Sequence, residues 1–85
     1  MFYTYILKSK KDANLYIGST TDLKRRFLEH NSGLVKSTKP RVPFKLIYYE
    51  AYAAEADARH REHNLKLRSK ALAQLLKRIS ESVKG

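Results

Sequence analysis

The chain has 85 residues, no cysteine, and a net charge of +10 from eighteen Lys and Arg against eight Asp and Glu. This length predicts one domain over residues 1–85, and the lack of cysteine excludes disulfides, thiolate zinc sites and thiol catalysis. No apolar run approaches the roughly 20 residues of a membrane span. We therefore expect a cytoplasmic protein with no membrane partner.

Positive charge is distributed along the whole chain. Residues 1–40 carry eight basic and three acidic side chains, and residues 41–85 carry ten and five, so each part has a net charge of +5. Such an excess favours a polyanionic partner, most often nucleic acid, through counterion release and electrostatic steering. A small soluble protein with a high isoelectric point is the alternative interpretation.

The N-terminal residues predict a β-hairpin. Residues 2–7 and 15–19 are rich in β-branched and aromatic side chains, which is typical of strands. The residues between them are polar and end in Asp-Ala-Asn, a turn composition. Gly18 interrupts the second strand, which indicates either a bulge or a close approach of a ligand to the backbone.

A helix is predicted after the hairpin and extends to about Asn31. Thr20 or Thr21 is its expected N-cap, and Asp22 in the first turn complements the helix dipole. Gly33 supplies a left-handed stop.

Beyond a polar loop, residues 44–52 predict a third strand and the periodicity then becomes helical. A break is plausible at Arg68-Ser69, and residues 70–83 predict an amphipathic helix. The element order β-β-α-β-α-α predicts an α+β fold, a three-stranded antiparallel sheet flanked by helices.

Glu62 lies within an otherwise apolar face of the second predicted helix. The other members of that face are Ala54, Ala58 and Leu65. An inward carboxylate must be paired, protonated or bound to a metal. A salt bridge is one interpretation, and Mg²⁺ completed by water and substrate phosphate is another. The possible salt-bridge partners are Arg26, Arg59 and Arg61.

Two further pairs carry side chains suited to phosphate chemistry. Tyr5 and Tyr16 lie on strands that should be neighbours, although strand tyrosines commonly serve only in packing. Arg26 and His30 lie one turn apart on the first helix. The arginine can clamp a phosphate and the histidine can move a proton near neutral pH, or both can simply extend into solvent.

These residues resemble a known family. Tyr3-Thr4-Tyr5, Tyr16-Ile17-Gly18, Arg26 with His30, and Arg61-Glu62 are similar in order and spacing to the motifs of the GIY-YIG nucleases, over about residues 2–66. The similarity is greatest to the small stand-alone bacterial members, which are related to the catalytic part of the excision-repair incision subunit. The first motif here lacks its glycine and isoleucine.

The resemblance implies a metal-dependent DNA endonuclease, structure-directed and acting in DNA repair or recombination, with Mg²⁺ or Mn²⁺ as cofactor. The catalytic residues that it implies are Tyr5, Tyr16, Arg26, His30 and Glu62. Glu62 would hold the metal, and Arg26 would stabilise the transition state. Either tyrosine would orient and deprotonate the attacking water, with His30 as a relay. The residues expected to contact DNA are Lys24, Arg25, Ser37, Thr38 and Lys39.

Other functional classes remain open at this stage. A non-catalytic nucleic-acid-binding module that retains the fold is favoured by the charge and by the lack of a separate specificity domain. A partner-binding protein could instead use the apolar stripe between Leu72 and Val83. We expect DNA as partner, a further protein that supplies specificity, and a monomer or weak dimer.

Overall fold

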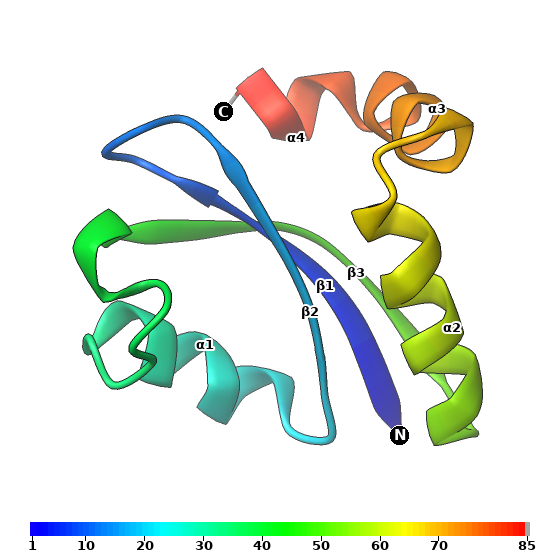
Figure 1. Ribbon diagram of the computed structural model, residues 1–85, viewed down its shortest axis with the longest axis horizontal. Coiled ribbons are helices and arrows are strands. Elements are labelled where there is room, and N and C mark those ends of the chain that lie inside the picture. The colour runs from blue at the N-terminus through cyan, green and yellow to red at the C-terminus, as the bar shows by residue number, and fades with distance from the viewer. Residues whose placement is uncertain (85) are drawn as a thin grey trace.

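Three antiparallel strands form a sheet in the order β2-β1-β3, and helices cover both of its faces in the computed structural model, which describes residues 1–84 (Figure 1). β1 spans Phe2–Ser9, β2 spans Leu15–Thr20 and β3 spans Phe44–Tyr52. β1 is central and pairs antiparallel with both neighbours. The predicted hairpin, the third strand and the α+β fold are confirmed.

The helical segments lie close to their predicted places. α1 spans Leu23–Asn31, α2 spans Glu55–Lys66, α3 spans Lys70–Arg78, α4 spans Ser80–Lys84, and a 3-10 turn, η1, spans Lys39–Arg41. The expected break before α3 is confirmed, because Arg68 has a φ of 53°. Within residues 1–84, no helix combines the length and the apolar character needed to cross a membrane.

Two helix boundaries differ from expectation. Asp22 is itself the N-cap of α1, because Thr20 still belongs to β2 and the Asp22 carboxylate accepts a hydrogen bond from the Arg25 backbone N–H at 3.1 Å. The predicted helix over residues 70–83 is two helices. Its backbone leaves the helical region at Ile79, with φ −109° and ψ 29°.

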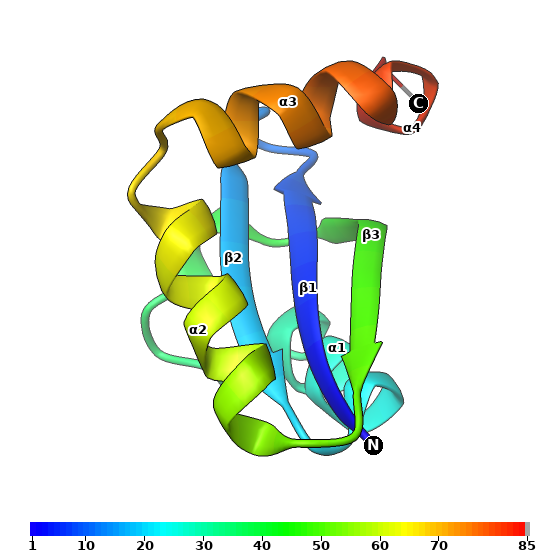
Figure 2. The same ribbon diagram turned by 90° about the vertical axis from the view of Figure 1, so that its right-hand side faces the viewer.

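The two faces of the sheet carry different cores. α1 lies on one face, and α2 and α3 lie on the other (Figure 2). The face under α2 and α3 buries aliphatic side chains from β1, β2, β3 and both helices, namely Ile6, Ile17, Ile47, Leu65, Leu72 and Leu75. The face under α1 buries a smaller and more aromatic cluster, Tyr5, Leu7 and Phe44. The stripe from Leu72 to Val83 therefore covers the sheet.

Gly18 has a different role from either that we expected. β2 passes through it in regular register, with Tyr5 as its partner on β1, so there is no bulge between these strands. A Cβ atom at Gly18 would lie only 2.5 Å from the Tyr5 hydroxyl oxygen and 2.7 Å from the Tyr5 Cζ. The ring of Tyr5 thus makes a close approach to the backbone at Gly18.

Candidate active site

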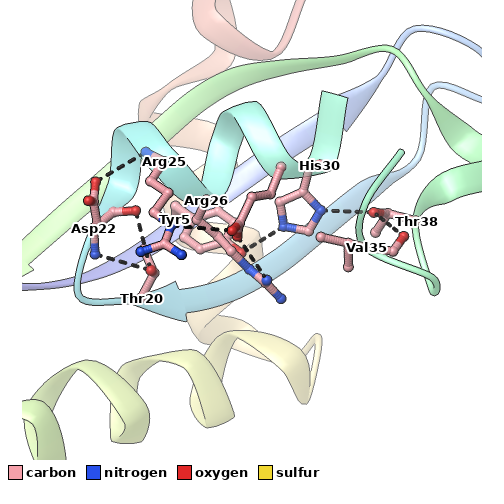
Figure 3. A network of polar contacts seen from close by, with 9 residues as sticks. Tyr5, Thr20, Asp22, Arg25, Arg26, His30, Val35 and Thr38 are labelled. Carbon is pink, nitrogen blue, oxygen red and sulfur yellow. Dashed lines mark hydrogen bonds and ion pairs between the residues drawn. The ribbon is translucent and has the colours of Figure 1, made fainter. Parts of the chain in front are cut away.

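Four of the five expected catalytic residues gather on the α1 face of the sheet, and Figure 3 shows three of them, Tyr5, Arg26 and His30. The ring of Tyr16 lies 4.9 Å from that of His30 and 6.3 Å from that of Tyr5, measured between centroids. Arg26 extends from α1 beside Tyr5. These residues come from β1, β2 and α1, so the hairpin and the following helix together build the cluster.

A chain of hydrogen bonds connects Tyr5 to the loop after α1. The Tyr5 hydroxyl lies 2.9 Å from His30 Nε2, and His30 Nδ1 lies 2.8 Å from Thr38 Oγ1. Thr38 donates to the Val35 carbonyl at 3.3 Å. Its hydroxyl therefore accepts from His30 Nδ1–H, which leaves Nε2 to accept the proton of Tyr5.

Burial keeps Tyr5 and His30 each in a single protonation state at neutral pH. Tyr5 is 1% exposed and His30 is completely buried. Desolvation raises the pKa of the Tyr5 phenol to about 12, and the neighbouring Arg26 guanidinium offsets only part of that rise. Desolvation, with a smaller contribution from Arg26, lowers the pKa of His30 to about 4. At pH 7 the tyrosine is therefore a neutral donor and the histidine a neutral acceptor.

Arg26 remains accessible at the edge of this cluster. Its side chain is 37% exposed, and Nη1 lies 3.3 Å from a carboxylate oxygen of Glu29. The other oxygen of Glu29 lies 3.4 Å from Nε of Arg25. Exposed ion pairs of this kind contribute little to stability, so an anion can compete for Arg26 at small cost.

Glu62 approaches β2 from the opposite side of the sheet. It extends from α2, is 20% exposed, and accepts a hydrogen bond from the Ser19 hydroxyl at 2.6 Å. Its other oxygen lies 2.6 Å from Nζ of Lys66. Desolvation raises the pKa of Glu62, but Lys66 and Ser19 outweigh it, so the pKa lies below its ordinary value. The carboxylate points inward, as expected, and is ionised at pH 7.

None of the three expected arginines is the ion-pair partner of Glu62. Arg26 pairs with Glu29, Arg59 pairs with Glu55, and Arg61 pairs with Glu50. Lys66 was not among the expected partners, although its spacing of four residues from Glu62 is the usual signature of a helical ion pair. Ser19 was not expected either, because its contact depends on how α2 lies against β2.

The position of α2 is fixed by a polar cluster on β3. Glu50 receives hydrogen bonds from Nε and Nη2 of Arg61, both at 3.0 Å, in a bidentate pair. Tyr48 donates to Glu50 at 2.6 Å, and Tyr52 also donates to it. Because Arg61 precedes Glu62 directly, this cluster sets where the Glu62 carboxylate meets β2.

A hollow of about 410 Å³ separates α1 from α2 at the end of β2. Arg26 lines it from α1, Arg59 and Ala58 line it from α2, and Ser19 lies between them. Glu62 follows Ala58 by one helical turn, so its carboxylate on Ser19 adjoins this hollow. Arg26 and Glu62 thus approach the same segment of β2 from the two faces of the sheet.

The residues expected to contact DNA separate into two groups. Lys24, Arg25, Ser37 and Lys39 are exposed. Thr38 is completely buried, and its hydroxyl is occupied by His30 and Val35, so it cannot contact a DNA backbone and that expectation is wrong. Its role is to hold the imidazole of His30, a role that no sequence spacing indicates.

Beside Ser19, Glu62 is the carboxylate that could hold a divalent cation, and Asp22, Glu29 and Glu55 line the neighbouring hollow. Among residues 1–84, no three His, Cys, Asp or Glu side chains are grouped as a metal site. Glu62 already carries a cation, the Lys66 ammonium, on one oxygen, and its pKa keeps it ionised. A hard oxygen ligand of this kind fits Mg²⁺ or Mn²⁺ if water and substrate phosphate complete the coordination and Lys66 moves aside.

Comparisons with known proteins show which sequences and which solved structure this chain resembles. The sequence matches the family model of the GIY-YIG catalytic domain over residues 1–77. It is 41% identical over 80 residues to a UPF0213 protein of Staphylococcus haemolyticus, covering 93% of this chain and 94% of that protein. It is 45% identical over 65 residues to a UPF0213 protein of Streptococcus pneumoniae, covering 75% of this chain and 65% of that protein. The solution NMR structure of a UPF0213 protein from Bacillus halodurans superimposes with a TM-score of 0.56 at 36% identity, covering 93% of this chain and 85% of that one.

Proposed function

Because this chain belongs to the GIY-YIG family, among its small UPF0213 proteins, we propose that it is a metal-dependent endonuclease that hydrolyses phosphodiester bonds in DNA. Domains of this family are generally nucleases. One observation carries the proposal for this chain. Arg26 stands beside Tyr5 and Tyr16 on one side of β2, and Ser19 of that strand holds an ionised Glu62 on the other.

Arg26 has the position and freedom that a phosphate clamp needs. It is partly exposed, its only ion pair in residues 1–84 is the weak one with Glu29, and it lines the hollow beside β2. A guanidinium offers two parallel N–H donors to phosphate oxygens. In the proposed reaction it binds the scissile phosphate and stabilises the negative charge that grows on its oxygens.

Tyr5 and Tyr16 take different roles in this proposal. Tyr5 is buried, and its raised pKa keeps the phenol protonated at pH 7, so it acts as a fixed donor that orients neighbouring groups and not as the base. Tyr16 is half-buried and faces the same cluster, so it is the tyrosine that can contact an attacking water. His30 holds Tyr5 in place, since its low pKa makes it an unsuitable relay for protons.

Glu62 would hold a Mg²⁺ or Mn²⁺ ion, which supplies charge neutralisation for the phosphate and its leaving oxygen. Two neighbouring groups make the carboxylate suitable for this role. Lys66 and Ser19 keep it ionised, and the Ser19 hydroxyl fixes one of its oxygens. Lys66 occupies the other oxygen until a cation replaces it. We place the activity in DNA repair or recombination, with substrate choice by DNA structure, because the domain has little surface for base readout.

The test compares Glu62→Ala with Asp57→Ala, an exposed carboxylate on the same helix that does not line the hollow beside β2. Both variants are incubated with nicked, flapped and supercoiled DNA, with Mg²⁺, with Mn²⁺ and with chelator. We expect Glu62→Ala to abolish metal-dependent cleavage and Mn²⁺ binding while circular dichroism and weak DNA affinity persist. Asp57→Ala should cleave normally. Undiminished cleavage by Glu62→Ala would reject the metal role.

The ion pair between Glu62 and Lys66 favours a second candidate, a nucleic-acid-binding module without catalysis. A carboxylate already neutralised by an ammonium at 2.6 Å needs no metal for its stability. In that case every DNA would bind and none would be cut in Mg²⁺ or Mn²⁺. Arg26→Ala distinguishes the two readily, because it should lower kcat by about 100-fold in a nuclease and affect only affinity in a binding module.

A further inference from the structure

An aromatic pair beside the candidate active site has no role in the proposed reaction. Tyr49 on β3 is 52% exposed, and its ring lies 6.0 Å from that of Tyr3 on β1, at an interplanar angle of 63°. Tyr5, Tyr48 and Tyr52, by contrast, direct their hydroxyls to protein partners. Tyr49 thus exposes a large apolar surface that the fold does not cover.

The pair lies on the same face of the sheet as the catalytic cluster. Tyr49 is the register partner of Tyr5 across β1 and β3, and side chains of directly opposed residues point to the same face. Tyr3 is two residues from Tyr5 on β1, so it also faces that side. A group seated on this pair would therefore be one strand away from the residues proposed to bind the scissile phosphate.

The surroundings of the pair combine apolar and charged groups. A shallow hollow of about 370 Å³ is bounded by Tyr3 and Tyr49 on the sheet and by the start of α1. The residues that α1 and the turn before it contribute are Thr21, Asp22, Leu23 and Lys24. The hollow carries two exposed charges, the carboxylate of Asp22, which caps α1 through Arg25 N–H, and the ammonium of Lys24, which is the one that can attract a phosphate.

We propose that Tyr49 and Tyr3 form a stacking site for an unpaired nucleobase of the DNA substrate. A half-exposed aromatic ring next to a lysine matches the two parts of a nucleotide, because the ring can stack on the flat base and the ammonium can contact the charged phosphate. The net charge of +10 favours a polyanion as the partner of this surface and disfavours another basic protein, which it would repel. Bases inside a duplex are already stacked, so only a single-stranded or flapped segment can use the site.

This inference deepens the proposed function, since it names the substrate class as DNA with unpaired nucleotides next to the cut. It is tested in chelator, so that binding is measured without cleavage. The chain contains no tryptophan, and Tyr49→Trp therefore introduces a single reporter that keeps an aromatic plane. Leu34→Trp is the matched control, because Leu34 is 74% exposed and lies outside the hollow.

We expect single-stranded DNA to quench the fluorescence of Tyr49→Trp, and blunt duplex to leave it unchanged at equal occupancy measured by anisotropy. Leu34→Trp should respond to neither. Tyr49→Ala should weaken single-strand binding by about fivefold or more, with duplex binding unchanged. Lys24→Ala should weaken both in a salt-dependent way.

Three results would overturn the stacking site. They are equal quenching by both DNAs, bound DNA without quenching, and a change of fluorescence with protein concentration alone, which would make this face a contact between copies of the chain. Binding and quenching without any cleavage in Mg²⁺ would refute the nuclease while leaving the stacking site intact.

Discussion

The two faces of the sheet bury different kinds of side chain. Under α2 and α3, the buried side chains are aliphatic and close-packed, with the exception of Thr4, which donates a hydrogen bond to the Ala58 carbonyl at 2.7 Å. Under α1, the interior contains a tyrosine, a histidine and a threonine that are almost completely buried and that satisfy one another by hydrogen bonds. Among residues 1–84, no buried polar side-chain atom lacks a partner.

The two kinds of core make different contributions, one mainly to the stability of the domain and the other to the geometry of the candidate site. Close-packed aliphatic side chains tolerate little loss of volume, but they carry no group that could take part in a reaction. A buried polar chain contributes less net stability, because its hydrogen bonds replace bonds to water, yet it fixes the position of each member. The α1 face can therefore hold Tyr5 rigidly beside Arg26, while the other face supplies most of the stability of the domain and positions α2.

The largest effect on stability is expected on the aliphatic face. Leu75 on α3 is 3% exposed and packs in the aliphatic cluster, so Leu75→Ala should lower the free energy of unfolding by about 2–5 kcal/mol. Urea titration measures this loss, with Ala73→Ser on the exposed side of α3 as control. DNA binding at a temperature where the variant is folded should be unchanged. A loss below about 1 kcal/mol would contradict the division of roles between the faces.

Acid should destabilise the protein through the α1 face. His30 has a pKa of about 4 in the fold against an ordinary value of 6.5, so the unfolded chain takes up a proton at a higher pH than the native one. Stability is therefore full above about pH 6.5 and falls as the pH approaches 4, by about 3 kcal/mol in total. The charged groups that act on the imidazole are Arg26, which lowers its pKa further, and Glu29, which raises it.

Thermal unfolding between pH 7 and pH 4 measures this dependence. His30→Gln should flatten the curve, because the glutamine does not titrate, whereas His60→Gln, at an exposed position of α2, should leave the slope as it is in the parent. Equal slopes for the parent and His30→Gln would show that another group, and not His30, controls the acid response.

The sequence predicted the strands and most helices because their signals are local. The aromatic and aliphatic composition of residues 44–52 and the apolar stripe after Ser69 depend only on neighbours along the chain. The partners within the site depend on three-dimensional approach. Thr38 looks like any polar loop residue until the loop returns it to His30, and Ser19 meets Glu62 only because α2 crosses the edge strand β2. Gly18 was marked as unusual, but its reason, the ring of Tyr5, lies on another strand.

Gly18 offers the sharpest test of how closely the α1 face is packed. A methyl group at this position would overlap the Tyr5 hydroxyl and lie 3.1 Å from Tyr16 Cε2, so Gly18→Ala should destabilise the fold by about 1–3 kcal/mol. In a Tyr5→Leu background the overlap with the phenol is gone, and the same substitution should be neutral or stabilising, because alanine is preferred to glycine within a strand by about 0.5–1 kcal/mol. A double-mutant cycle followed by urea denaturation measures this change of sign. If Gly18→Ala cost the same in both backgrounds, the glycine would be required by the backbone of β2 itself and not by the ring that lies over it.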